Sequence, residues 1–261
     1  MKATSAKVTT IGTFDGIHIG HQKILKRVVA LAQQQSCIPI VLTLFPHPRM
    51  VLQKDDSIKL LNTIDERVTL LKSHGIEEVV VKTFTKEFAN LSAKSYVEDI
   101  LVNELNTKQI VIGYDHHFGK NRSANINDLK TFAKVYDFNV EEISAQDIQD
   151  VTVSSTKIRT ALNNGEVDLA NSFLGYNYFI TATVIKGKGL GRTINFPTAN
   201  MYIEEAYKLI PKDGVYVVKS IIEGRLIFGM MNIGTNPTVG GKKRSIEVHF
   251  FDYENDIYGT Q

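Results

Sequence analysis

The feature that most constrains the fold is a change in the spacing of apolar residues about two-thirds of the way along this 261-residue chain. Up to about residue 175, short apolar runs alternate with segments of helical period, and after it the apolar runs follow one another without such segments. Strands separated by helices indicate a parallel sheet with right-handed crossovers, whereas successive strands indicate an antiparallel sheet. The sequence therefore predicts two domains, an α/β domain over residues 1–175 and an all-β domain over residues 176–261.

The α/β part is expected to hold strands and helices in alternation. The expected strands are 8–12, 38–45, 79–84, 109–113 and 139–143, and the expected helices are 22–32, 68–71, 96–105 and 129–136. Thr63 and Glu66 have the spacing of a capping box before the second helix, and Gly75 is a typical stop after it. Open parallel sheets bind ligands beyond the carboxyl ends of their strands, so chemistry is expected there.

The all-β part is expected to contain strands without long helices. The expected strands are 179–185, 214–222, 225–231 and 245–251. Glu223-Gly224 fits a tight turn between two of these strands. We expect the strands to form a small barrel, with the domain boundary near residues 165 to 178, where the period changes.

Composition excludes several classes of protein. Apolar residues make up 43% of the chain and charged residues 22%, which is typical of a soluble globular protein. The 30 basic and 28 acidic side chains leave a net charge of only +2, which argues against a dedicated nucleic-acid or membrane-surface binder. The single Cys37 excludes an internal disulfide and a cysteine-based zinc site. Because no signal peptide or stretch of roughly 20 apolar residues is recognisable, a cytoplasmic location is expected.

The segment Gly12–His21 lies between the first expected strand and the first expected helix. Its glycines let the backbone approach a phosphate closely. His18 and His21 lie near a helix N-terminus, where amide groups and the helix dipole favour an anion. Two imidazoles on that anion could donate hydrogen bonds to charge that grows during phosphoryl transfer.

The alternative is a glycine-rich turn with two incidental surface histidines, which is the usual explanation of an isolated His-x-x-His. The glycines, Asp15 and the strand–turn–helix context favour the anion site instead. No Gly-Lys-Ser/Thr follows, so the segment is not a Walker-type phosphate loop.

This segment resembles the HxGH motif of the nucleotidyl transferase superfamily, and its longer form, Gly-x-Phe-Asp-Gly-x-His-x-Gly-His, resembles bacterial FAD synthetases. Further segments match that family in order, at residues 45–48, 113–119 and 154–159. The resemblance implies a Rossmann-like nucleotidyl transferase domain. Ser123–Asn125 stands where many relatives carry a glycine, so the resemblance does not extend to the shape of that loop.

The resemblance also implies site residues in this domain. The side chains expected at the ATP phosphates are His18, His21, Ser155, Thr156 and Arg159. Asp115 is expected near the flavin or nucleotide, and the nucleotide-binding segment comprises Gly12, Phe14, Asp15 and Gly16. By residue type alone, serines at a helix start are often simple N-caps, and a helical arginine is often solvated.

A second candidate site joins a glycine-rich loop to a Thr-x-Asn pair. The loop comprises Gly187, Lys188, Gly189, Gly191 and Arg192. Its backbone amides and two cations could wrap a polyphosphate, although such a run taken alone is better explained as a flexible hairpin tip. Thr198 and Asn200 offer hard oxygen ligands suited to Mg²⁺, and the alternative is an ordinary turn after a proline.

This stretch resembles riboflavin kinases, whose signature is a Pro-Thr-Ala-Asn tetrad after a glycine-rich loop, here at residues 197–200. The match continues at residues 214–216, 232–238 and 247–252. The resemblance implies a riboflavin kinase-like small β-barrel in which Thr198 and Asn200 contact Mg²⁺–ATP and Asn232 contributes to binding. It also implies that Glu247 is the base that accepts the ribityl hydroxyl proton, a task that suits a carboxylate.

Together the two resemblances cover nearly the whole chain, in the order of the bifunctional bacterial riboflavin kinase/FAD synthetases. They imply that ATP phosphorylates riboflavin to FMN and then adenylylates FMN to FAD with release of pyrophosphate. The expected partners are small-molecule nucleotides and flavins, without nucleic acid or membrane, and the expected state is a monomer or weak homo-oligomer. In that family the kinase domain continues with another strand and a helix, so the domain is expected to be incomplete in a sequence that ends at Gln261.

Two other functions stay open at this point. One is a nucleotidyl transferase acting on another phosphorylated cofactor precursor, such as pantetheine phosphate or nicotinamide mononucleotide, which needs no β domain. The other is a non-catalytic flavin-binding regulatory protein, against which the intact His-x-Gly-His and Pro-Thr-Ala-Asn segments argue. A hydrolase that depends on metal alone fits poorly, because no cluster offers three spaced metal ligands.

Overall fold

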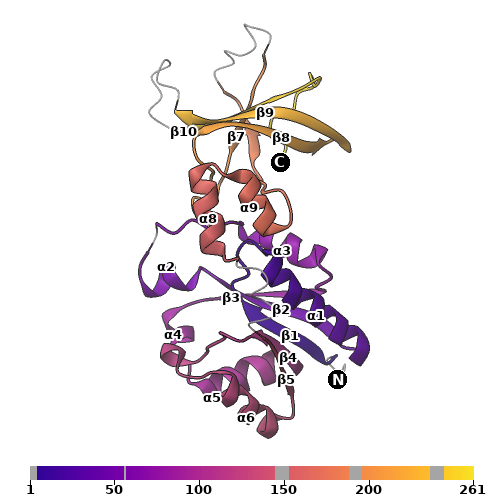
Figure 1. Cartoon of the computed structure of the whole chain (residues 1–261), viewed down its shortest axis with the longest axis vertical. Coiled ribbons are helices and arrows are strands. Elements are labelled where there is room, and N and C mark those ends of the chain that lie inside the picture. Colours follow the sequence, from indigo (N-terminus) through magenta and orange to yellow (C-terminus); the bar gives the residue numbers. More distant parts are fainter. Residues whose placement is uncertain (1–4, 56, 145–152, 188–195, 236–243) are drawn as a thin grey trace. The chain divides into compact units, whose positions relative to one another are not determined.

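The computed structural model describes residues 5–55, 57–144, 153–187, 196–235 and 244–261. The chain divides into two compact units (Figure 1). The first comprises Met1–Thr156 and Phe173–Gly175, and the second comprises Lys157–Ser172 and Tyr176–Gln261. The domain boundary between residues 175 and 176 stays a prediction.

The first unit is built on a parallel sheet in the order β3-β2-β1-β4-β5 (Figure 1). Its strands are β1 (Lys7–Gly12), β2 (Ile38–Phe45), β3 (Glu78–Thr83), β4 (Thr107–Gly113) and β5 (Asn139–Ile143). Each predicted strand of this unit is present, which confirms the α/β prediction. The strand order reverses at β1, whose neighbours are β2 and β4. Doubly wound sheets bind ligands at such a switch point, beyond the carboxyl ends of the strands.

Helices connect these strands. They are α1 (Ile19–Gln35), α2 (Pro48–Leu52), α3 (Ile64–Ser73), α4 (Lys86–Ala89), α5 (Ala93–Ser95), the π-helix η1 (Tyr96–Glu104), the 3₁₀ turn η2 (Lys120–Arg122) and α6 (Ile126–Tyr136). Two more helices, α8 (Ser155–Asn164) and α9 (Val167–Leu174), follow β5. The predicted capping box of α3 is confirmed. The Glu66 amide donates to the Thr63 hydroxyl at 3.1 Å, and the Thr63 amide donates to the Glu66 carboxylate at 2.9 Å.

Apolar side chains pack on both faces of the parallel sheet. Helices η1 and α6 cover one face, where the packed residues include Ile40, Leu42, Ile110, Ile112, Leu101 and Leu129. Helices α1 and α3 cover the other face, where they include Val8, Val41, Val111, Leu25, Val28 and Leu71. A fully buried leucine or valine contributes about 1.5–3 kcal/mol. These contacts fix α1 on the sheet, so the N-terminus of α1 is held at the carboxyl edge of β1.

The second unit is built on an antiparallel sheet in the order β6-β7-β10-β9-β8, of which Figure 1 labels β7 to β10. Its strands are β6 (Thr183–Ile185), β7 (Ala199–Tyr202), β8 (Gly214–Ile222), β9 (Arg225–Thr235) and β10 (Arg244–Phe250). Glu223 and Gly224 join β8 to β9 with φ angles of 52° and 76°. A type I′ turn requires positive φ at both positions, so the predicted tight turn is confirmed.

Two elements of this unit differ from the sequence prediction. The strand predicted over 179–185 is limited to β6, because the residues before it bond to side chains instead of a neighbouring strand. The Tyr178 amide donates to Asn171 at 2.7 Å, and the Phe179 carbonyl accepts from Lys208 at 2.9 Å. Strand β7 was not predicted, since its residues follow a proline and its pairing with β6 and β10 depends on the tertiary fold.

The chain after β10 returns to β6. The Gly259 amide donates to the Val184 carbonyl at 2.8 Å, and the Val184 amide donates to the Thr260 carbonyl at 2.9 Å. With a φ of 77° at Gly259, this pattern is a G1 bulge. Among the helices that the structure describes, none is long and apolar enough to cross a membrane.

Candidate active sites

The loop between β1 and α1 forms the first candidate site, and its backbone is strained. Phe14, Gly16 and Ile17 have φ angles of 47°, 84° and 34°. Left-handed backbone costs a residue other than glycine roughly 1–2 kcal/mol. A methyl group on Gly16 would also overlap Leu61 Cδ1, so only glycine fits there. Such strain persists where the surrounding structure holds it, and it is concentrated at functional sites.

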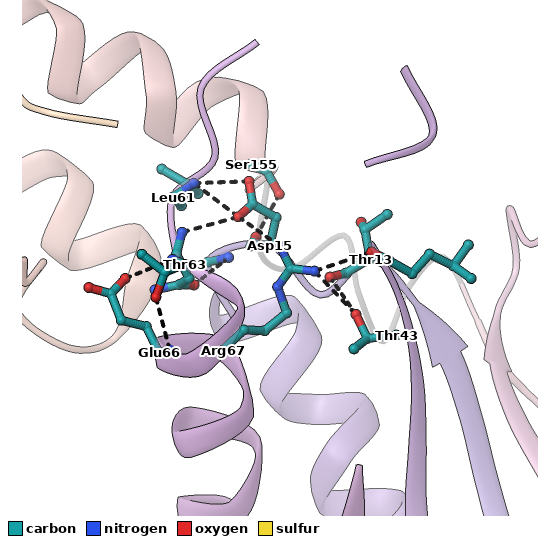
Figure 2. A network of polar contacts seen from close by, with 11 residues as sticks. Thr13, Asp15, Thr43, Leu61, Thr63, Glu66, Arg67 and Ser155 are labelled. Atoms are coloured by element: carbon teal, nitrogen blue, oxygen red, sulfur yellow. Dashed lines mark hydrogen bonds and ion pairs between the residues drawn. The ribbon is translucent and has the colours of Figure 1, made fainter. Parts of the chain in front are cut away.

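A buried polar network holds this loop (Figure 2). The Asp15 carboxylate, 1% exposed, accepts the backbone amides of Leu61 at 2.9 Å and Asn62 at 3.2 Å. The Gly16 amide donates to Asn62 Oδ1 at 2.9 Å, and the Ser155 hydroxyl donates to the Asp15 carbonyl at 2.9 Å. The loop is therefore tied both to the segment before α3 and to the first residue of α8.

His18 and His21 stack on each other at the start of α1. Their ring centroids are 3.7 Å apart and their planes differ by 17°. The Phe14 ring lies 5.1 Å from the His21 ring and also covers Gly12. His18 is the N-cap of α1, because its Nδ1 accepts the His21 amide at 3.4 Å. Nδ1 of His21 is buried and has no hydrogen-bond partner among the described residues.

Both imidazoles are neutral at neutral pH. Burial lowers the pKa of His18 to about 4, although the nearby Asp15 carboxylate opposes the shift. Burial also lowers the pKa of His21 well below its usual value, and His18 and Arg67 add to this effect. The positive end of the α1 dipole likewise disfavours an imidazolium at this place. The loop therefore offers an anion N–H groups and the helix terminus instead of two imidazolium charges.

His18→Asn should flatten the pH dependence of stability between pH 6.5 and about 4. Because the pKa is lowered by folding, the unfolded chain binds a proton that the folded chain rejects, and the free energy of unfolding falls as pH falls through this window. The difference between 6.5 and about 4 corresponds to about 3 kcal/mol. Asparagine retains an N-cap oxygen but does not titrate. Thermal unfolding followed at several pH values checks this, and a slope equal to that of the wild type would contradict it.

Asp115 lies in the loop after β4, and its side chain is exposed. Since β1 and β4 are parallel neighbours, this loop and the histidine loop lie at the same edge of the sheet. In the segment without the family glycine, Ala124 is buried and pairs with Phe118, and Asn125 caps α6. The departure at 123–125 is therefore compatible with an ordered loop beside Asp115.

The remaining predicted phosphate ligands lie on α8. Ser155 is brought to the histidine loop by its bond to Asp15. Thr156 follows it with an exposed side chain, and Arg159 lies one turn further along, in the second unit. The contribution of Thr156 and Arg159 to phosphate binding stays a prediction.

The second candidate site is a row of polar side chains across three strands of the antiparallel sheet. Glu247 of the central strand β10 lies directly opposite Asn200 of β7 and Asn232 of β9. Directly opposed residues share a face, with Cβ atoms about 4.5–5.5 Å apart. The Thr198 hydroxyl donates to Glu247 Oε2 at 3.3 Å, and the Ser245 hydroxyl donates to Oε1 at 3.3 Å. The two hydroxyls orient the carboxylate.

The backbone of Gly187 lies against this row, next to the side chain of Asn200. A methyl group at this position would overlap the Asn200 amide, so the asparagine side chain lies over the glycine backbone. The rest of the predicted glycine-rich loop, namely Lys188, Gly189, Gly191 and Arg192, lies outside the described residues.

Two protein families match the chain, one for each sheet. The FAD synthetase family matches residues 1–157, and the riboflavin kinase family matches residues 174–261. A bifunctional riboflavin kinase/FMN adenylyltransferase of Listeria monocytogenes is 38% identical over 257 residues, which is 98% of this chain and 81% of the relative. The chain belongs to this bifunctional family. Another relative with the same description, from Bacillus subtilis, is 37% identical over 270 residues, covering 100% of this chain and 83% of the relative.

A solved structure also resembles this member of the bifunctional family over both units. It is described as a macrolide-efflux protein from Streptococcus pneumoniae, with a TM-score of 0.85 and 32% identity. The match covers 98% of this chain and 84% of that one. That description belongs to the solved protein alone. The likeness confirms the predicted α/β domain followed by an all-β domain. The described strands of the all-β domain form one antiparallel sheet with β6 and β8 at its edges, so its closure into a small barrel stays a prediction.

The sequence interpretation missed two buried residues that contact the loop between β1 and α1, namely Arg67 on α3 and Asn62 in the segment before it. Arg67 is 1% exposed, and one of its terminal nitrogens lies 3.7 Å from Asp15 Oδ1. A signal was present, because Arg67 precedes Leu71 by four residues and therefore puts a charge on the apolar stripe of α3. A charge in that position needs a buried partner. The sequence alone did not identify Asp15 as this partner.

The row of polar side chains around Glu247, called the kinase row below, offers oxygen atoms that fit Mg²⁺. The Thr198 hydroxyl and the Asn200 amide oxygen are hard oxygen donors gathered beside Glu247 on one face of the sheet. Within the described parts of the chain, no group of three or more His, Cys, Asp or Glu side chains could hold a metal ion. Mg²⁺ commonly takes few protein ligands and completes its shell with water and substrate phosphate, which is the role this row can serve.

Proposed function

We propose that the second unit phosphorylates riboflavin to FMN with ATP, and that the first unit adenylylates FMN to FAD with release of pyrophosphate. The chain is a riboflavin kinase and FMN adenylyltransferase, and ATP, riboflavin, FMN and FAD are its substrates or products. We assign one reaction to each unit because each sheet holds one candidate site. Stacked His18 and His21 follow β1, and Glu247 stands between Asn200 and Asn232 on β10.

Phosphoryl transfer takes place at the kinase row. The carboxylate accepts the proton of the terminal ribityl hydroxyl as that oxygen bonds to the γ-phosphorus of ATP. The bond from the γ-phosphorus to its bridging oxygen breaks, and ADP leaves. The hydroxyls of Thr198 and Ser245 hold the carboxylate in one orientation before the substrate arrives, which lowers the entropic cost of the reaction.

Mg²⁺ is the cofactor that this row would hold, through Thr198 and Asn200. When bound, it neutralises part of the negative charge of the ATP phosphates. The protein residues of the row supply orientation and the base.

Adenylyl transfer takes place at the histidine loop. A phosphate oxygen of FMN bonds to the α-phosphorus of ATP, the bond from that phosphorus to the bridging oxygen of the β-phosphate breaks, and pyrophosphate leaves. No covalent enzyme intermediate is needed, so catalysis consists of positioning and stabilisation of charge. His18, His21 and the N-terminus of α1 donate hydrogen bonds to the charge that grows on the phosphates.

The experiment that tests both activities is chromatography of flavins after the pure protein has been incubated with ATP, Mg²⁺ and either riboflavin or FMN. FMN followed by FAD from riboflavin is the expected result. FAD from FMN without FMN from riboflavin would leave only the adenylyltransferase. No conversion of either flavin by folded protein would favour a flavin-binding protein instead. We further expect a monomer or weak homo-oligomer in the cytoplasm.

A further inference from the structure

Arg67 is buried behind the histidine loop and has no part in the reaction steps given above. We propose that Arg67 is a positioning residue for adenylyl transfer, whose guanidinium clamps the Asp15 loop to the end of β2 and so sets where His18 and His21 meet the phosphates. This inference rests on the proposed adenylyltransferase function. It concerns a residue that contacts the loop and not the reacting atoms.

The contacts of Arg67 join two neighbouring strand ends (Figure 2). One terminal nitrogen lies 3.7 Å from Asp15 Oδ1, with both side chains 1% exposed. The other donates to the Thr43 hydroxyl at 3.3 Å and to the Leu44 carbonyl at 3.4 Å. The Thr43 hydroxyl in turn donates to the Thr13 carbonyl at 3.1 Å. Arg67 thus bridges the loop after β1 and the last residues of β2.

An uncharged side chain at position 67 could not compensate the charge of the Asp15 carboxylate. The Asp15 carboxylate is buried, and its partners are the backbone amides of Leu61 and Asn62 together with the Arg67 guanidinium. Removing one partner of a buried ion pair leaves an uncompensated charge, which the remaining structure avoids by moving or admitting water. Asp15 is the partner expected to shift, because it lies in a loop with positive φ at Phe14 and Gly16, whereas Arg67 lies on helix α3.

A shift of Asp15 would displace His18 more than His21. His21 lies in the first turn of α1, whose buried Leu25 and Val28 fix the helix on the sheet. His18 lies outside the helix as its N-cap and follows the loop. The stacked pair would therefore separate, although α1 stays in place. The field of the guanidinium also reaches His21, whose pKa is lowered by burial first and then by His18 and Arg67.

The test compares Arg67→Met and Arg67→Lys with the wild type, and uses Arg27→Met as the matched control. Arg27 is an arginine of the same unit whose ion pair with Glu141 lies at the surface, with side chains 42% and 27% exposed. Initial rates of FAD formation from FMN give kcat and KM for ATP, rates of FMN formation from riboflavin give the kinase activity, and thermal unfolding reports stability.

We expect Arg67→Met to lower the kcat of adenylylation about 30- to 100-fold, since a misplacement of roughly 1 Å costs on this order, with KM for ATP changed less than about threefold. Arg67→Lys should recover part of this loss, because it restores the cation but not the fork that reaches both Asp15 and Thr43. Kinase activity should stay within about twofold in every variant, and Arg27→Met should match the wild type in both reactions.

A second variant keeps the test decisive should Arg67→Met fold poorly. Thr43→Val preserves the volume but removes the hydroxyl that links Arg67 to Thr13. We expect it to lower kcat about 5- to 10-fold at unchanged KM, a loss of about 1–1.4 kcal/mol in transition-state stabilisation.

Three results would overturn the proposal: adenylylation by Arg67→Met at a rate within twofold of the wild type, a loss expressed in KM alone, or a lysine variant as slow as the methionine variant. A wild type that forms FMN but no FAD would instead overturn the adenylyltransferase function itself, so the two failures are distinguishable.

Discussion

Glu247→Gln is expected to suppress FMN formation by about 10²–10⁴-fold and to leave FAD formation from supplied FMN unchanged. Glutamine keeps the length of the side chain and an oxygen that can accept from Thr198 and Ser245, so the row retains its shape. It cannot take up the ribityl proton near neutral pH. The loss is therefore expected in kcat, because the substrate can still occupy the site.

The measurement is the rate of each reaction in turn, with riboflavin or FMN supplied. Glu223→Gln is a suitable control, since it removes a carboxylate from the turn between β8 and β9 in the same unit. We expect this control to match the wild type in both reactions. Undiminished FMN formation by Glu247→Gln would exclude Glu247 as the base. Loss of both reactions in a folded variant would contradict two independent sites.

The elements that could be predicted from the sequence are those whose signals are local. Strand β8 matches its predicted bounds because its nine residues form an apolar run rich in β-branched side chains, which ends at the turn residues Glu223 and Gly224. Helix α3 is longer than the predicted 68–71, but its N-cap lies where predicted because Thr63 and Glu66 form their capping box three residues apart. Strand β7 has only four residues after a proline, and its structure comes from pairing with β6 and β10. Distant partners of this kind leave no mark in the local pattern.

In both sites, residues that are adjacent in the sequence could be predicted, whereas partners brought together only by the fold could not. The His18–His21 pair could be predicted, because its members and the helix they precede are contiguous. The residues that hold the loop could not, since Asp15 finds its amide partner Asn62 across 47 residues. In the kinase row, Thr198 and Asn200 could be singled out by their hard oxygen donors, whereas the role of Glu247 followed only from the family resemblance. The register of β10 then places Glu247 opposite both asparagines.

His21→Ala is expected to slow FAD formation about a hundredfold, which corresponds to about 3 kcal/mol of transition-state stabilisation. Its Nδ1 is buried and lacks a hydrogen-bond partner among the described residues, and the ring is held between His18 and Phe14. A ring fixed in this way can donate to the phosphates with little reorganisation when charge develops there, so its removal should lower kcat more than it raises KM.

The bifunctional chain provides its own control for this variant, because FMN formation from riboflavin depends on the other unit and should be unchanged. His74→Ala, which changes a histidine at the end of α3, should match the wild type in both reactions. A hundredfold loss confined to kcat of FAD formation would place His21 at the growing charge. A loss in KM alone would make it a ground-state contact of ATP. FAD formation at a near-normal rate would remove His21 from the mechanism and leave the N-terminus of α1 as the principal donor to the phosphates.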